Sequence, residues 1–259
     1  TVESIGLMAP GLASWATSQA VLAGERPYTA EPMPTAMAML LPANERRRTT
    51  ATIKLALHVA HEAMAQTNHD ARTVRTVFAS SGGDSEVLDK ICVALTQPDR
   101  PVSPTHFHQS VHNTPAGYWT IATGCTQPSL SLSAYDDSFT VGLLEAAALA
   151  WADAAPVLLI AYDVPPPFPL SERRNLVAPF AVALLLNPVT TATQRAVLRL
   201  GLICKESVDP LGDAGLERLR SGNPAARSLP LLCAIAQRAT GRVMLATGAG
   251  AALGVEIDA

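Results

Sequence analysis

The chain has 259 residues, enough to bury a substantial hydrophobic core. Hydrophobic residues make up 48% of it and charged residues only 16%, with a mean hydropathy of +0.20. So low a charged fraction predicts that part of the apolar surface is buried against a partner. The net charge of −3 and the isoelectric point near 6.0 argue against nucleic acid or an anionic membrane as a ligand.

Cysteine spacing and hydropathy narrow the class further. The four cysteines form no CxxC pair, which predicts reduced thiols in a cytoplasmic protein rather than disulfides or a zinc site: Cys92, Cys125, Cys204 and Cys233. We find no signal peptide, and the longest apolar stretch, residues 143–160, is interrupted by Glu145, Asp153 and Pro156. We therefore expect no membrane span, no metal and no cofactor.

Buried strands alternate with helices along the chain. The predicted strands are residues 4–8, 77–79, 129–133, 157–162, 181–186, 196–204, 242–247 and 252–257. The predicted helices are residues 12–23, a helix capped by Thr49 or Thr50, and residues 86–96, 111–122, 139–151 and 228–239. Residues 25–47 are expected to be irregular. This order is typical of an α/β fold with a mixed sheet covered by helices.

The middle of the chain carries a family resemblance. Asn113, Ala116-Gly117, Thr120-Ile121, Gly124 and Pro128-Ser129 stand in the order and spacing that β-ketoacyl synthases use before their nucleophile. The strand Leu130-Ser131-Leu132 and the tripeptide Ala134-Tyr135-Asp136 follow. Residues 4–205 resemble the N-terminal half of these enzymes, which implies a thiolase-like fold. In this register Asp136 occupies the position of the family's nucleophilic cysteine.

A narrower resemblance rests on Ser110-Val111-His112-Asn113 followed by Gly117-Tyr118-Trp119. These residues resemble the short β-ketoacyl-synthase-like proteins of aryl polyene and xanthomonadin-type pigment biosynthesis. The resemblance implies one thiolase-like domain over residues 1–259. Residues 1–205 would form its ketosynthase-like core, and residues 206–259 would form a strongly reduced C-terminal half.

The chemistry of a condensing enzyme is missing from this sequence. Such an enzyme needs a thiolate at a helix N-terminus, and an acylated aspartate would be an unsuitable mixed anhydride. The family also uses two histidines and a lysine that follow the cysteine. All six histidines here precede Asp136, and the only later lysine is Lys205, in the wrong context. We therefore predict no catalytic activity, and we interpret Asp136 and Asp137 as helix caps.

The resemblance implies a role through a partner instead. Ketosynthases are dimers whose central sheets join, so this chain would pair with a full-length ketosynthase as a chain-length factor in type II polyketide synthesis. An acyl carrier protein would meet it through that complex. His106 and Ser110 are expected to face the partner's growing acyl chain, with Val111 or His112 packed nearby. The complete predicted interface and tunnel set is His106, Phe107, Ser110, Val111, His112 and Asn113.

Alternatives remain open on the sequence alone. Cys125 could serve a small acyltransferase or thioesterase with His108 or His112 as its base, although a buried structural cysteine is the simpler interpretation. A homodimeric module that binds acyl carriers is a third hypothesis. His58, His61 and His69 are interpreted as surface or interface residues rather than as metal ligands. Arg46-Arg47-Arg48 could meet an acidic carrier protein, although a solvated surface is the more common role of such a run.

Overall fold

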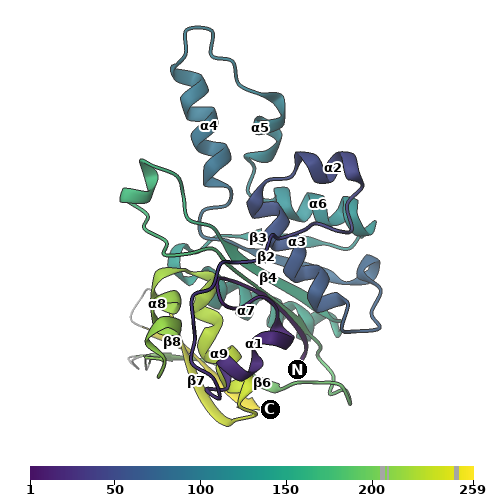
Figure 1. Cartoon of the computed structure of the whole chain (residues 1–259). Coiled ribbons are helices and arrows are strands. Elements are labelled where there is room, and N and C mark those ends of the chain that lie inside the picture. The colour runs from purple at the N-terminus through teal and green to yellow at the C-terminus, as the bar shows by residue number, and fades with distance from the viewer. Residues whose placement is uncertain (205–207, 209, 248–250) are drawn as a thin grey trace.

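The computed structural model describes residues 1–204, 208, 210–247 and 251–259 (Figure 1). Its strands are β1 (Val2–Met8), β2 (Arg75–Ala79), β3 (Ser129–Leu132), β4 (Val157–Asp163), β5 (Phe180–Leu186), β6 (Val197–Cys204), β7 (Thr240–Ala246) and β8 (Ala251–Asp258). Its α-helices are α1 (Trp15–Leu22), α2 (Ala43–Arg48), α3 (Ala51–Met64), α4 (Ser85–Thr96), α5 (Pro104–Gln109), α6 (Thr114–Thr123), α7 (Ser138–Asp153), α8 (Ala214–Gly222) and α9 (Leu229–Ala236).

The larger sheet has the strand order β1-β5-β4-β2-β3. β2 pairs in parallel with both β3 and β4, whereas β5 runs antiparallel to β4 and β1. The sheet is therefore mixed, as predicted. β4 and β5 are buried along their whole length because helices cover both faces. β3 lies at an edge, and its first two residues are exposed.

Helices α3 and α7 pack on opposite faces of this sheet. Alternate residues of β2 and β4 point to the two sides, with Phe78 and Leu158 among the α3 residues and Val77 and Leu159 among the α7 residues. Contact with α7 is tight, since a Cβ added at Gly142 would lie 2.9 Å from the Ala79 side chain.

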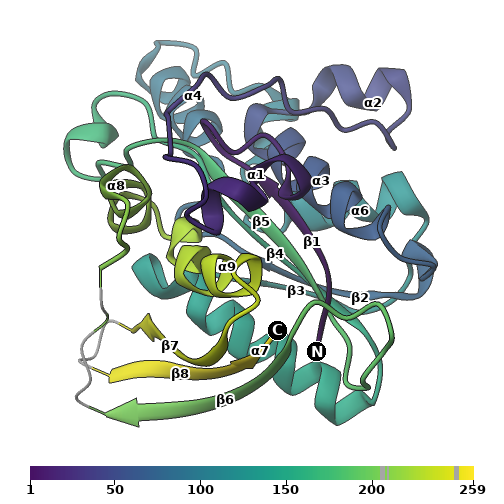
Figure 2. The same cartoon turned by 60° about the horizontal axis from the view of Figure 1, so that its bottom comes forward.

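The smaller sheet has the order β6-β8-β7 and is antiparallel. Figure 2 shows α7 and α9 between the two sheets. One core joins these layers, because Leu253 and Val255 of β8 belong to the same buried cluster as Phe139 and Leu143 of α7. The Thr140 hydroxyl also donates to the carbonyl oxygen of Ala246 at 3.0 Å. Both predicted C-terminal strands are confirmed, while the glycine-rich turn predicted between them lies outside the described residues.

Local chemistry explains where several elements begin. The Thr50 hydroxyl accepts a hydrogen bond from the amide of Ile53, which confirms the predicted cap of α3. Ser14 caps α1 in the same way, so this helix begins three residues later than predicted. The prediction that residues 25–47 are irregular is wrong at its end, where α2 forms. The predicted helices also did not include α5 and α8.

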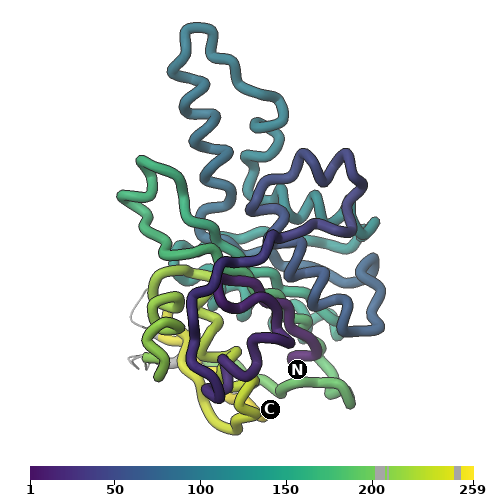
Figure 3. The backbone as a smooth tube through the Cα atoms, viewed as in Figure 1, coloured from purple at the N-terminus to yellow at the C-terminus, as the bar shows by residue number. Residues whose placement is uncertain are grey.

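Helices α4 and α5 form an arm, defined here as residues 84–110, that extends away from the rest of the molecule (Figures 1 and 3). Val87 is the one buried residue of α4. Three other apolar side chains of that helix are about half exposed: Leu88, Val93 and Leu95. Within the described residues, no helix combines the length and apolar character needed to cross a bilayer.

Candidate functional site

The connection from β3 to α7, called the elbow here, comprises residues 133–138. Tyr135 adopts a left-handed backbone with φ of +53° and opens the short 3-10 turn Tyr135–Asp137. The Ser138 hydroxyl accepts a hydrogen bond from the amide of Ala134 at 3.0 Å and donates to the carbonyl oxygen of Tyr135 at 2.8 Å. The strained position at this elbow is therefore Tyr135, one residue before Asp136.

The prediction that Asp136 and Asp137 cap the helix is confirmed only for the position of Asp137, whereas Asp136 lies within the preceding 3-10 turn. Asp137 is the N-cap residue of α7, but its side chain makes no capping hydrogen bond. Both carboxylates instead face arginines from distant segments. Asp136 lies 2.5 Å from Arg174 and 3.3 Å from Arg227, and Asp137 lies 2.8 Å from Arg227. A charge-assisted contact between a carboxylate and a guanidinium group is stronger than a capping hydrogen bond from a neutral amide.

Arg174 also packs against the ring of Tyr135 in the elbow. The Arg174 guanidinium lies 4.0 Å from the centre of the Tyr135 ring, within the range of a cation–π contact. Its side chain is only 20% exposed, and that of Arg227 only 21%. The first turn of α7 is thus neutralised and covered by the chain's own side chains. This arrangement offers a carboxylate held by arginines, and no thiol, at the position where the resemblance puts the nucleophile.

Beside the elbow, a polar cluster lies at the carboxyl ends of β2 and β4. The Oδ1 atom of buried Asp163 accepts hydrogen bonds from the amide of Ser81 at 2.9 Å and from the hydroxyls of Ser81 and Ser80 at 2.7 and 3.2 Å. Burial raises the pKa of Asp163 to about 6, although these donors oppose the shift. His112 donates to the backbone carbonyl of Ser80 at 3.1 Å. The carboxylate contacts the serines directly, so these residues do not have the geometry of a catalytic triad.

Sequence reasoning missed Asp163 as a site residue. A signal was present, because an aspartate ends an otherwise apolar strand and Ser80-Ser81 end another. β2 and β4 are parallel neighbours, which brings their carboxyl ends together.

Cys125 lies far from this cluster. Its side chain is buried, and the thiol donates to the carbonyl oxygen of Val74 at 3.4 Å, just before β2 begins. His112 contacts Ser80, just after β2 ends. The five residues of β2 separate Val74 from Ser80, and the six steps along the strand span about 20 Å at ~3.3 Å per residue. His112 therefore cannot act as a base for Cys125. His108, the other candidate base, packs edge-on against Tyr118 of α6.

The six predicted interface residues do not all point the same way. Phe107, Val111 and Asn113 line one cavity of about 450 Å³ together with residues of α6. Phe107 is 69% exposed. The Ser110 hydroxyl donates to the carbonyl oxygen of Phe107, and His106 is half-buried on α5. His112 turns inward to Ser80. Three of the six are thus brought together at the surface, and His112 is not.

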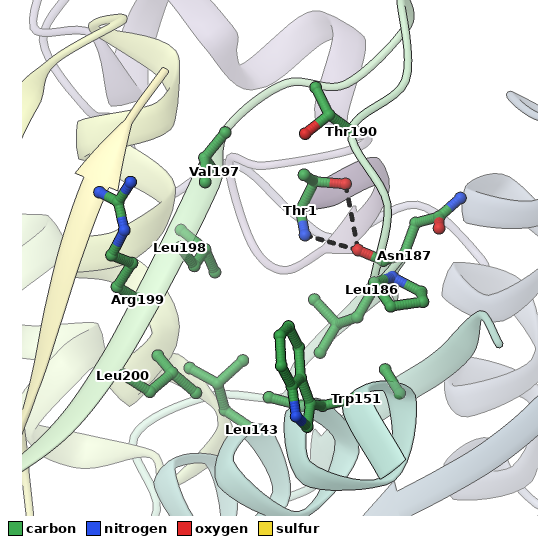
Figure 4. Close-up of a pocket in the computed structure, with 13 residues that line it drawn as sticks. Thr1, Leu143, Trp151, Leu186, Asn187, Thr190, Val197, Leu198, Arg199 and Leu200 are labelled. Carbon is green, nitrogen blue, oxygen red and sulfur yellow. Dashed lines mark hydrogen bonds between the residues drawn. The ribbon is translucent and has the colours of Figure 1, made fainter. Parts of the chain in front are cut away.

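Further apolar side chains are exposed on the arm, on α6, on β3 and on α7, and we treat them together as the apolar surface. It comprises Leu88, Val93, Leu95, Phe107, Val111, Ile121, Leu130, Val141, Leu144 and Trp151. Those of α7 recur at helical spacing, and Trp151 is 80% exposed. Figure 4 shows Trp151 beside a pocket of about 270 Å³ between α7, the end of β5 and β6. Exposed apolar side chains in such number make these elements candidates for contact with another molecule.

The remaining histidines and arginines have other surroundings. His69 lies 3.1 Å from the Glu3 carboxylate, and His58 accepts a hydrogen bond from the amide of Met37. In the part of the chain that the structure describes, no three His, Cys, Asp or Glu side chains are grouped to hold a metal. Arg46-Arg47-Arg48 form the last turn of α2, where Arg48 pairs with Glu45 at 3.7 Å.

Comparison with known proteins agrees with this fold. The chain is similar to a ketosynthase (ApeO) in complex with its chain length factor (ApeC) from Xenorhabdus doucetiae, at 23% identity and a TM-score of 0.74, over 99% of this chain and 98% of that chain. It is similar to the ishigamide ketosynthase/chain length factor at 13% identity and a TM-score of 0.70, over 100% and 99% of the two chains.

A third similar structure is longer. The module 6 ketosynthase of the bacillaene synthase from Bacillus subtilis 168 matches at 12% identity and a TM-score of 0.58, over 85% of this chain and 44% of that chain. No curated protein matches the sequence. The predicted thiolase-like fold is confirmed. A model of the β-ketoacyl synthase N-terminal domain matches residues 14–217. The chain therefore belongs to the β-ketoacyl synthase family, through its N-terminal domain.

Proposed function

We propose that this chain is a non-catalytic subunit of the chain-length-factor type, which pairs with a full-length ketosynthase. The observation that carries the proposal is the elbow, where Asp136 is ion-paired to Arg174 and Arg227. A condensing enzyme needs a free thiolate there, with room for an acyl chain. A carboxylate that is paired with two arginines supplies no thiolate.

The extent of the structural matches supports the same proposal. The matches to two ketosynthase and chain-length-factor complexes cover 98% and 99% of the matched chains, so those chains are about as short as this one. The bacillaene ketosynthase is matched over only 44% of its length. We infer that residues 206–259 stand in for a full second half and that residues 1–259 act as one domain.

The apolar surface defined above is our proposed contact with the ketosynthase. β3 is an edge strand, and its free backbone groups can pair with a strand of a partner sheet. Gly117 of α6 is exposed, and a Cβ added there would meet nothing within 4 Å, so a partner can approach the backbone closely. Residues 106–113 belong to the same region. We propose that Phe107 and Val111 contact the partner, with His106 and Ser110 limiting its acyl tunnel.

The proposed product class follows from the resemblance to the aryl polyene and xanthomonadin-type subgroup. The subunit would set how many extension rounds fit in the ketosynthase tunnel. Covalent catalysis, and binding of the acyl carrier protein to the active centre, would belong to the partner or to the joint surface of the complex.

The direct test is co-expression with a full-length ketosynthase from the same organism, beginning with any that is encoded near this chain. We expect a complex with one copy of each subunit, measured by analytical ultracentrifugation, and condensation of malonyl-carrier substrates only when both subunits are present. Leu130→Asp and Ile121→Asp should break the complex, because each buries a charge in the proposed interface. Val189→Asp is the matched control, since Val189 is 65% exposed but lies outside the defined surface.

Two outcomes would overturn the proposal. One is condensation or thioester hydrolysis by the purified single chain, which would point to an enzyme instead. The other is a ketosynthase that remains separate from this chain and is fully active without it. A homodimer that binds acyl carrier protein would show the third hypothesis to be the better one.

A further inference from the structure

The connection between β4 and β5, called the 164–179 loop here, projects beside the base of α4 in both views (Figures 1 and 2). It exposes two large apolar side chains, with Phe168 72% and Leu170 45% accessible. Exposed apolar groups on a loop next to an apolar surface extend that surface. The loop therefore continues the proposed partner contact around the base of the arm.

Backbone hydrogen bonds make the tip of this loop a compact turn. The amide of Ser171 donates to the carbonyl oxygen of Pro167 at 2.9 Å, and the amides of Arg173 and Arg174 donate to that of Leu170 at 3.0 and 2.8 Å. Leu170 and Arg174 are thereby joined through one turn of chain. Whatever fixes the Arg174 side chain also fixes the position of Leu170.

Arg174 is fixed at the elbow. Its Nη1 atom pairs with Asp136, and its guanidinium stacks on Tyr135. Its Nη2 atom is buried without a hydrogen-bond partner in the described residues, and the Asp163 carboxylate attracts the Arg174 charge. A guanidinium held by a carboxylate, a ring and a buried charge has little freedom to move.

The stem of the loop is fixed separately. The side-chain amide of buried Asn223 donates to the carbonyl oxygens of Ala178 and Asp163 at 2.8 and 3.2 Å. The amide of Val177 donates to the carbonyl oxygen of Gly222 at 3.0 Å. The stem therefore keeps its place without the elbow, and the elbow contact acts on the tip.

We propose that Asp136 is a positioning residue. Its carboxylate anchors Arg174 and so orders the tip of the 164–179 loop, which presents Phe168 and Leu170 to the ketosynthase partner. The partner part of this inference rests on the proposed function. The anchoring part does not, because it concerns contacts within the chain.

The anchoring part is tested by hydrogen–deuterium exchange of the purified chain. Asp136→Asn should speed exchange of the amides of residues 170–174 about tenfold, since it weakens a charge-assisted contact. Asp136→Glu keeps the charge and should restore part of the protection. Asp70→Asn is the matched control, because Asp70 forms a comparable 2.6 Å pair with Arg72 away from the loop. Unchanged exchange in Asp136→Asn would overturn the anchor.

The partner part is tested by affinity for the co-purified ketosynthase, measured by surface plasmon resonance. The double variant Phe168→Ser/Leu170→Ser should weaken binding about tenfold, which corresponds to the loss of one good contact. The single variant Asp136→Asn should weaken binding by the same factor. Combining all three substitutions should add little, because they remove the same contact. Full affinity in Asp136→Asn despite a freed loop would overturn presentation to the partner. If the wild-type chain bound no ketosynthase, the proposed function would fail, while the exchange experiment would still decide the anchor.

Discussion

Replacing Asp163 with asparagine should stabilise the chain at neutral pH. The Asp163 side chain is 2% exposed at the end of β4, and its Oδ2 atom has no hydrogen-bond partner in the described residues. Burial raises its pKa from the ordinary value of 3.8 to about 6, against the opposing effect of Ser80, Ser81 and Arg174. The buried carboxylate is therefore under-compensated when ionised.

The size and sign of the effect follow from this pKa. Each unit of pKa corresponds to about 1.4 kcal/mol, so the ionised form of Asp163 costs the fold on the order of 3 kcal/mol relative to the protonated form. An acid with a higher pKa in the folded chain holds its proton more tightly when folded. The free energy of unfolding consequently falls as pH rises from about 4 to about 6, and this contribution is fully lost above that range.

Urea unfolding at pH 4.5, 6.0 and 7.5, followed by tryptophan fluorescence, measures the effect. Asp163→Asn keeps an oxygen that accepts the hydrogen bonds of Ser80 and Ser81. Relative to the wild type, we expect the variant to gain about 2 kcal/mol between pH 4.5 and pH 7.5, because about 1 of the ~3 kcal/mol is already lost at pH 4.5. Glu62, whose pKa burial also raises, is present in both proteins, so the difference between them isolates Asp163. A variant no more stable than the wild type at pH 7.5 would refute the reasoning.

Three further substitutions or modifications test other parts of the structure. Asn223→Ala removes a side chain that hydrogen-bonds three segments and should lower the free energy of unfolding by about 2–4 kcal/mol in the same urea assay. Gly6→Ala should prevent soluble folding, since the new Cβ would lie 2.0 Å from a carbonyl oxygen of α3, whereas Gly117→Ala, in open space, should have no effect on solubility. Iodoacetamide should label exposed Cys92 in the native chain and buried Cys125 only after unfolding, as read by peptide mass spectrometry; rapid native labelling of Cys125 would revive the enzyme hypothesis.

Periodicity and local caps were enough to predict most of the layers. β4 is buried on both faces, and this burial leaves an uninterrupted apolar run in the sequence. The threonine cap of α3 depends on an interaction within three residues, so it can also be recognised from the sequence. The predicted position of the elbow between β3 and α7 is confirmed for the same reason, because a short strand and a long apolar helix flank it.

Features that depend on distant contacts were missed. α5 has only six residues, which is too short for a recognisable helical periodicity. Its capping serine and the proline at its start were the local signals of a helix. Aspartate is a residue type that commonly caps helices, which is why Asp136 and Asp137 were interpreted as caps. Only the fold shows that Arg174 and Arg227 lie close enough to form ion pairs with them. The partners of Asp163 likewise come from the end of a neighbouring strand.

The charges at the elbow bear on whether position 136 could carry the family's nucleophile in this fold. A nucleophile at the start of α7 requires that the helix N-terminus stay open to an acyl group. Here Tyr135 and Arg174 cover it, and the arginine is itself held by the turn that carries Leu170. A cysteine at position 136 would leave the largely buried Arg174 without its ion-pair partner, whereas Arg227 would keep Asp137, so the isolated substitution would lower the stability of the fold. On the proposed function, Asp136 therefore serves to hold Arg174 in place, and the exposed apolar groups of the defined surface are our proposed contact with the partner.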